Sequence, residues 1–131
     1  MIELTLPLPS VKLQPNKMVH RLGKLKLIAQ ARDEAGFNAI KQHPDVKGWS
    51  RAAIRPIFYR KQKSHFMDAD NAIAWLKTTI DGLVYSGMFT DDKELIYLPV
   101  VQRVDKEDPR LVLQVTEVDD TVCPMCERRL P

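Results

Sequence analysis

Apolar and polar positions alternate over residues 2–8, and this period of two predicts a β-strand with one buried face. Its prolines place the end of the strand at or near a sheet edge. Residues 52–59 predict a second strand. The ranges Glu94–Val104 and Arg110–Val118 predict two more strands, which the polar turn 105–109 would join as a hairpin.

Two other stretches show helical spacing. From Lys24 to about His43, apolar residues recur every three or four positions, and Pro44 ends the pattern. Three of these positions are alanines, which implies a close approach to the neighbouring element. Asp70 to Ser86 is the clearest helix, and its core stripe is Ile73, Leu76, Ile80, Leu83 and Val84. The order β-α-β-α-β-β predicts an α/β fold (α+β-like), a single domain with a small mixed sheet packed against two helices.

Composition places the chain among ordinary globular proteins. It has 131 residues, of which 44% are hydrophobic and 28% charged, so one domain is expected. No run approaches the roughly 18 apolar residues that span a bilayer, and the N-terminus does not resemble a signal peptide. We therefore expect a cytoplasmic protein with no membrane partner, with one domain over residues 1–120 and a tail over residues 121–131.

Basic residues are unevenly distributed, although the net charge is only +3. Residues 1–32 hold six Lys or Arg against one acid, and the range Lys47–Met67 holds six more and no acid. A basic groove around an acidic centre would suit a protein that binds phosphates and holds a metal with carboxylates. Chance clustering on a solvated surface is the alternative, and charge alone does not decide between them.

The segment Asp68-Ala69-Asp70-Asn71 lies where a basic strand end meets a helix N-terminus. Two carboxylates at i, i+2 in an extended chain point to the same side, and they repel each other unless a cation such as Mg²⁺ lies between them. The simpler interpretation is that Asp70 or its neighbour caps the helix while Asp68 is an exposed loop residue.

Two further features favour chemistry over a cap. Lys77 falls on the same helical stripe as Asp70, where it could hold a scissile phosphate, although an i, i+4 ion pair with Asp81 would also explain it. Asp91 and Asp92 follow the helix and could bring a third carboxylate to the same place, although Asp-Asp is ordinary in a turn. Three carboxylates, a lysine and a basic surround together match a metal-dependent phosphodiesterase.

Four stretches of the chain resemble the RusA-type endodeoxyribonucleases, which resolve Holliday junctions. They are the opening strand Leu4-Thr5-Leu6-Pro7-Leu8-Pro9-Ser10; Pro15-Asn16 with His20-Arg21, similar to the phage-type branch; the helix signature Asp68-Ala69-Asp70-Asn71, Leu76-Lys77 and Asp81-Gly82-Leu83; and the closing Gly87-Met88-Phe89-Thr90-Asp91-Asp92. Together they span roughly residues 2–118. Where family members often carry an Arg-rich run before the first Asp, this chain has Ser64-His65-Phe66-Met67.

The resemblance implies a homodimer that nicks a four-way DNA junction symmetrically with Mg²⁺, or with Mn²⁺ as a substitute, in recombination or repair in a phage or prophage. Asp68, Asp70 and Asp92 would bind the metal, with Asp91 a lesser candidate, and Lys77 would be the catalytic lysine. The residues expected to contact DNA are Lys12, Asn16, Lys17, His20, Arg21, Lys24, Arg60, Lys61 and Lys63. A non-catalytic DNA-binding protein of the same fold, or a nuclease for other branched DNA, are the alternatives.

Cys123 and Cys126 form a Cys-x-x-Cys pair near the C-terminus. Such a pair supplies half of a tetrahedral zinc site, and a two-fold dimer could complete it from two tails. A tail with two free thiols is the alternative.

Overall fold

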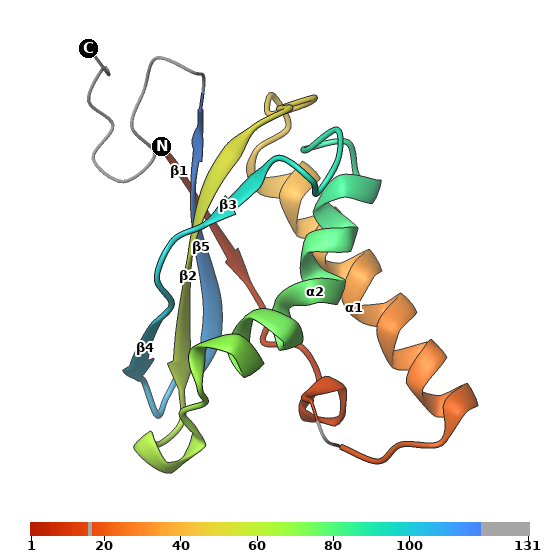
Figure 1. Cartoon of the computed structure of the whole chain (residues 1–131), viewed down its shortest axis with the longest axis vertical. Helices are drawn as coiled ribbons and strands as arrows, with labels where there is room; N and C mark the ends of the chain where they lie inside the picture. The colour runs from red at the N-terminus through yellow and green to blue at the C-terminus, as the bar shows by residue number, and fades with distance from the viewer. Residues whose placement is uncertain (16, 119–131) are drawn as a thin grey trace.

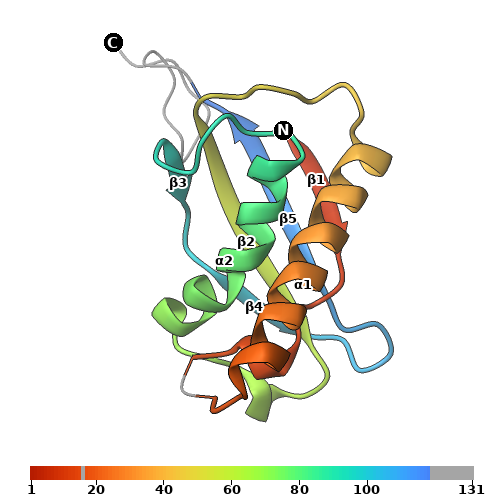
Figure 2. The ribbon, with the colours of Figure 1, turned by 90° about the vertical axis from the view of Figure 1, so that its right-hand side faces the viewer.

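The computed structural model describes residues 1–15 and 17–118. Within these residues the sheet has five strands, β1 (Ile2–Leu6), β2 (Ala52–Arg60), β3 (Leu95–Tyr97), β4 (Val101–Val104) and β5 (Arg110–Glu117). The helices are α1 (Arg21–Gln42) and α2 (Ala69–Tyr85), together with the short 3₁₀ turns η1 (Val11–Leu13) and η2 (Lys63–His65). Figures 1 and 2 show both long helices on one face of the sheet. The predicted α+β arrangement of two helices on a mixed sheet is confirmed.

The strand order is β1-β5-β2-β3, and β4 also pairs with β2. β2 is antiparallel to β5 on one side, and on the other side it is parallel to both β3 and β4. The predicted strand Glu94–Val104 is therefore two short strands along one edge of β2. The break between them lies opposite Pro56, which has no N–H for the ladder, and it contains Pro99.

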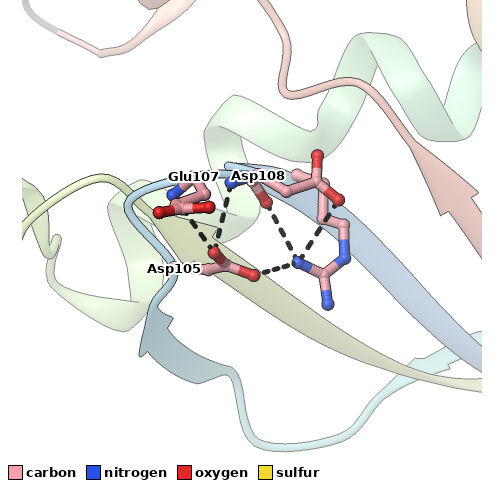
Figure 3. Close-up of polar contacts among 4 residues, drawn as sticks. Asp105, Glu107 and Asp108 are labelled. Atoms are coloured by element: carbon pink, nitrogen blue, oxygen red, sulfur yellow. Dashed lines mark hydrogen bonds and ion pairs between the residues drawn. The ribbon is translucent and has the colours of Figure 1, made fainter.

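The predicted hairpin between Glu94–Val104 and Arg110–Val118 is wrong, because β2 lies between β4 and β5. The turn carries the chain around the end of β2. Asp105 organises this turn, accepting hydrogen bonds from the N–H groups of Glu107 (3.2 Å) and Asp108 (3.1 Å) and pairing with Arg110 at 2.7 Å (Figure 3). The hydrogen bond from Arg110 lowers the pKa of the Asp105 carboxyl. The short connection between β4 and β5 favoured a hairpin, but the more apolar β2 lies between them in the sheet.

The core lies between the sheet and the helices. Its largest fully buried side chains include Leu4, Ile54, Phe58, Trp75, Leu76, Ile80, Leu83, Leu111, Leu113 and Val115. The predicted stripe of α2 is confirmed, with Ile73 and Val84 partly buried against this cluster. Gly87 ends α2 as expected, because its φ of +90° allows Met88 N–H to reach Leu83 O at 3.1 Å.

The close approach expected of the first helix occurs at Gly82 of α2. A Cβ built on Gly82 would lie 2.9 Å from Ala35 Cβ and even closer to the backbone oxygen of Arg32. The crossing of α1 and α2 therefore depends on a glycine on one side and buried alanines on the other. Among residues 1–15 and 17–118, neither helix has the combination of length and hydropathy that a bilayer-spanning segment requires.

Candidate active site

Lys77 and Asp92, two of the predicted site residues, meet in the structure. Lys77 Nζ lies 2.8 Å from Asp81 Oδ1 and 2.9 Å from Asp92 Oδ2. Lys77 and Asp81 belong to α2, whereas Asp92 lies in the loop that follows it. The i, i+4 pair that the sequence offered as a plain alternative is therefore present, but the same ammonium group also holds the distant carboxylate.

The ammonium group of Lys77 is stabilised by both carboxylates of this cluster. The hydrogen bonds to Asp81 and Asp92 raise the pKa of Lys77, so its ammonium group stays charged at neutral pH. The hydrogen bond from Lys77 lowers the pKa of the Asp92 carboxyl. All three side chains remain partly exposed, so solvent and substrate can reach the cluster. A cation flanked by two carboxylates at the surface is thus the first element of the candidate site.

The loop after α2 is anchored so that Asp92 can reach Lys77. Trp49 forms a parallel bridge with the buried Phe89, and Trp49 N–H donates to Met88 O at 3.0 Å. Asp91 turns inward on its own loop, accepting a hydrogen bond from Lys93 N–H at 3.1 Å. The structure thus gives Asp91 a role in the turn and leaves Asp92 to contact α2.

Asp68 and Asp70 occupy the other end of α2. Asp68 is the N-cap residue, its side chain makes no capping hydrogen bond, and Asp70 lies in the first turn. Both are exposed, and neither forms a side-chain hydrogen bond or ion pair with the residues that the structure describes. Asp68 thus occupies the cap position without a side-chain capping hydrogen bond, and both carboxylates are open to an outside cation.

The predicted metal ligands do not converge on one point. Lys77 is seven residues after Asp70, which is about 10.5 Å along the helix axis, and Asp92 is bound to Lys77. In the part of the chain that the structure describes, no group of three or more His, Cys, Asp or Glu side chains is arranged to hold a metal ion. Asp68 and Asp70 fit Mg²⁺ by their donor chemistry, whereas Asp92 faces Lys77.

Tyr97 is a site neighbour that the sequence analysis missed. It ends β3, where its register opposite Ile54 places the side chain on the helix-covered face of the sheet. Tyr97 is 39% exposed, and the charges of Lys77, Asp92 and Asp81 all act on its hydroxyl. Partial burial raises the pKa of the Tyr97 hydroxyl. Only the pairing of β3 with β2 brings it here, so no local sequence signal marks it.

Three of the predicted DNA-contacting residues line one open hollow. Lys12, Lys17 and His20 border a space of about 590 Å³ between η1 and the start of α1, together with Val11, Met18, Val19 and Gly23. Figures 1 and 2 show this loop at the same end of the molecule as η2 and the beginning of α2. Trp75 Nε1–H donates to Ser10 O at 3.0 Å and ties the loop to α2. Arg21 and Lys24 are exposed in the first turn of α1.

The second basic segment divides into surface and core. Lys61 and Lys63 are exposed near η2. Arg60, by contrast, is only 5% exposed, and its guanidinium lies over the Trp75 ring at 4.8 Å and donates to His65 O at 2.9 Å. The expectation that Arg60 contacts DNA is therefore corrected, because its side chain points to the helix-covered face and packs. Asn16, Cys123 and Cys126 lie outside the described residues.

No protein-family model matches the chain, and no curated protein matches it.

Proposed function

We propose that the chain is a Mg²⁺-dependent DNA endonuclease that nicks four-way junctions. The observation that carries the proposal is the contact of Lys77 with Asp92. These residues were singled out separately from sequence, and the fold joins them across 15 positions at 2.9 Å. Charged residues scattered on a solvated surface without a function would not need Lys77 and Asp92 to be in contact.

Asp68 and Asp70 would hold the metal, because they are exposed carboxylates without partners of their own among the described residues. The bound ion would polarise the phosphoryl group and favour attack by water. Lys77 supplies a fixed positive charge on the same stripe of α2 as Asp70, suited to a phosphate oxygen or to the departing 3′ oxygen. Asp81 and Asp92 hold that ammonium group in place from two sides.

The basic residues around the hollow would bind the DNA backbone. Lys12, Lys17 and His20 face one space, and Lys61 and Lys63 are exposed at the same end of the molecule. Cations of this kind bind the phosphate backbone without reading sequence. The resemblance to RusA-type enzymes supports the four-way junction as substrate and a homodimer as the acting form, since the two-fold symmetry of the junction requires two equivalent active sites.

A non-catalytic DNA-binding protein of this fold is the second candidate. One observation favours it: Asp92 is paired with Lys77, and no three-ligand group forms among residues 1–15 and 17–118. The two free carboxylates Asp68 and Asp70 argue for the enzyme, because acids beside a phosphate only weaken a protein that merely binds.

The test compares substrates. The full chain is incubated with a labelled four-way junction, a replication fork and a linear duplex, each with and without Mg²⁺, while binding is followed in parallel. The proposal expects Mg²⁺-dependent nicks at symmetric positions in the junction and little cutting of the duplex. Binding to all three without any nick favours the second candidate, and equal cutting of the linear duplex contradicts the junction preference alone.

A further inference from the structure

The side chain of Gln102 makes two hydrogen bonds to the backbone of a single residue, Met67. Gln102 Oε1 accepts from Met67 N–H at 2.8 Å, and Gln102 Nε2 donates to Met67 O at 2.7 Å. Gln102 lies on β4 opposite Phe58 of β2, and this register directs its side chain to the helix-covered face. An amide that satisfies both groups of one residue acts as a substitute for a paired strand.

Met67 is the residue immediately before Asp68. Asp68 O then accepts from Ala72 N–H at 3.0 Å, which begins the hydrogen bonding of α2. The approach to Met67 is fixed as well, because Arg60 donates to His65 O and η2 closes with Phe66 N–H to Lys63 O at 3.0 Å. Gln102 therefore hydrogen-bonds the backbone of the residue directly before Asp68.

Neither carboxylate at this end of α2 is held by a side-chain partner among the described residues. The N-cap side chain of Asp68 forms no hydrogen bond, and Asp70 has no partner. Helix N-termini without a side-chain cap fray easily. The backbone that leads into both carboxylates is held at Met67 by the packing of the Met67 side chain against the core and by the two hydrogen bonds of Gln102.

We propose that Gln102 is a positioning residue that sets Asp68 and Asp70 in register for a divalent cation. The inference rests on the proposed function of that site. The inference extends that function by assigning the geometry of the metal-binding pair to the side-chain amide of Gln102 on β4, 34 positions after Asp68 in the sequence. Outer contacts of this kind control affinity because metal ligands must hold their geometry closely.

The test uses Gln102→Met, which keeps an unbranched side chain of similar length but removes both hydrogen bonds. The chain offers a matched control. Gln42 makes the same two-bond contact at the free edge of β1, accepting from Thr5 N–H at 2.9 Å and donating to Thr5 O at 2.6 Å. Gln42→Met therefore removes a pair of bonds with the same pattern, in a more exposed position away from Asp68.

Mn²⁺ affinity is measured by calorimetry for the full-length wild type, both variants and Asp70→Asn, and amide hydrogen exchange is followed at residues 67–72. We expect Gln102→Met to bind Mn²⁺ about 10- to 100-fold more weakly, the range seen when an outer-shell partner is lost. Exchange at 67–72 should accelerate in the same variant. Gln42→Met should match the wild type in both readouts.

The outcomes separate the two proposals. Wild-type Mn²⁺ binding that Asp70→Asn abolishes and Gln102→Met leaves unchanged overturns the role of Gln102 and leaves the proposed function standing. Equal weakening by both glutamine variants also overturns it, because general destabilisation then explains the effect. A wild type that binds no Mn²⁺ overturns the metal site itself and the role of Gln102 with it.

Discussion

The crossing of α1 and α2 makes a quantitative prediction at Gly82. An alanine there would place its Cβ 2.9 Å from Ala35 Cβ and in hard overlap with Arg32 O. Because Arg32 O belongs to a helix backbone, no side-chain rotation relieves the overlap, and the two helices must separate. Gly82 follows Asp81 directly, so the displacement also disturbs the contact of Asp81 with Lys77.

The magnitude follows from two opposed terms. Replacing glycine by alanine inside a helix stabilises it by about 1 kcal/mol. Overpacking a tight contact costs about 1–3 kcal/mol, and rigid backbone places Gly82 at the upper end. We therefore expect Gly82→Ala to lower the free energy of unfolding by about 2 kcal/mol, the upper cost less the helix gain.

Urea unfolding of the wild type and of two variants checks this value. Gly23→Ala, on α1, is the matched control, because its Cβ would meet only Val19 Cγ1 at 4.0 Å. It should keep the helix gain and unfold at an equal or higher urea concentration than the wild type, with the same dependence on urea. A Gly82→Ala protein as stable as the wild type would refute the close crossing of the two helices.

Two other predictions concern Arg60 and Asp92. Arg60→Met should lower the free energy of unfolding, measured with urea, by about 1–3 kcal/mol, because stacking on Trp75 and a charged hydrogen bond are lost. Lys61→Met, at an exposed neighbouring position, should change the free energy of unfolding little. Equal effects of the two variants would contradict the buried role of Arg60. NMR titration of the Asp92 carboxyl should give a pKa below the usual Asp value, which Lys77→Met shifts upward. Because the folded pKa is lowered, the stabilisation from this pair is present at neutral pH and is lost as pH falls through that pKa. A titration that Lys77→Met leaves unchanged would contradict the contact.

The elements with a strong period were predicted well. The apolar stripe of α2 and the alanines of α1 define which faces meet, and both are confirmed. The position of β2 was not predicted, because a turn of five residues can either close a hairpin or pass around the end of a third strand. Long-range packing decides between these, and the buried β2, with Phe58 and Ile54 in the core, wins the central place.

In the candidate site, too, local spacing predicted some residues, and long-range pairing determined the others. Lys77 was placed on the stripe of Asp70 by helical spacing alone, and its meeting with Asp92 follows from the short loop after α2. Arg60 was misassigned, because charge in a sequence does not show which face of a strand it occupies. Gln102 and Tyr97 were missed since only the pairing of β4 and β3 with β2 brings them near α2.

We propose that Asp68 and Asp70 bind the metal of a phosphodiesterase site in which Asp81 and Asp92 hold the ammonium group of Lys77. The most direct measurement is single-turnover nicking of a labelled four-way junction with Mg²⁺ by the wild type and by Asp70→Asn, with junction binding measured for both. The wild type should make paired nicks, and Asp70→Asn should bind the junction without nicking it. Cutting by Asp70→Asn at the wild-type rate, or no cutting by the wild type despite binding, would contradict the proposal.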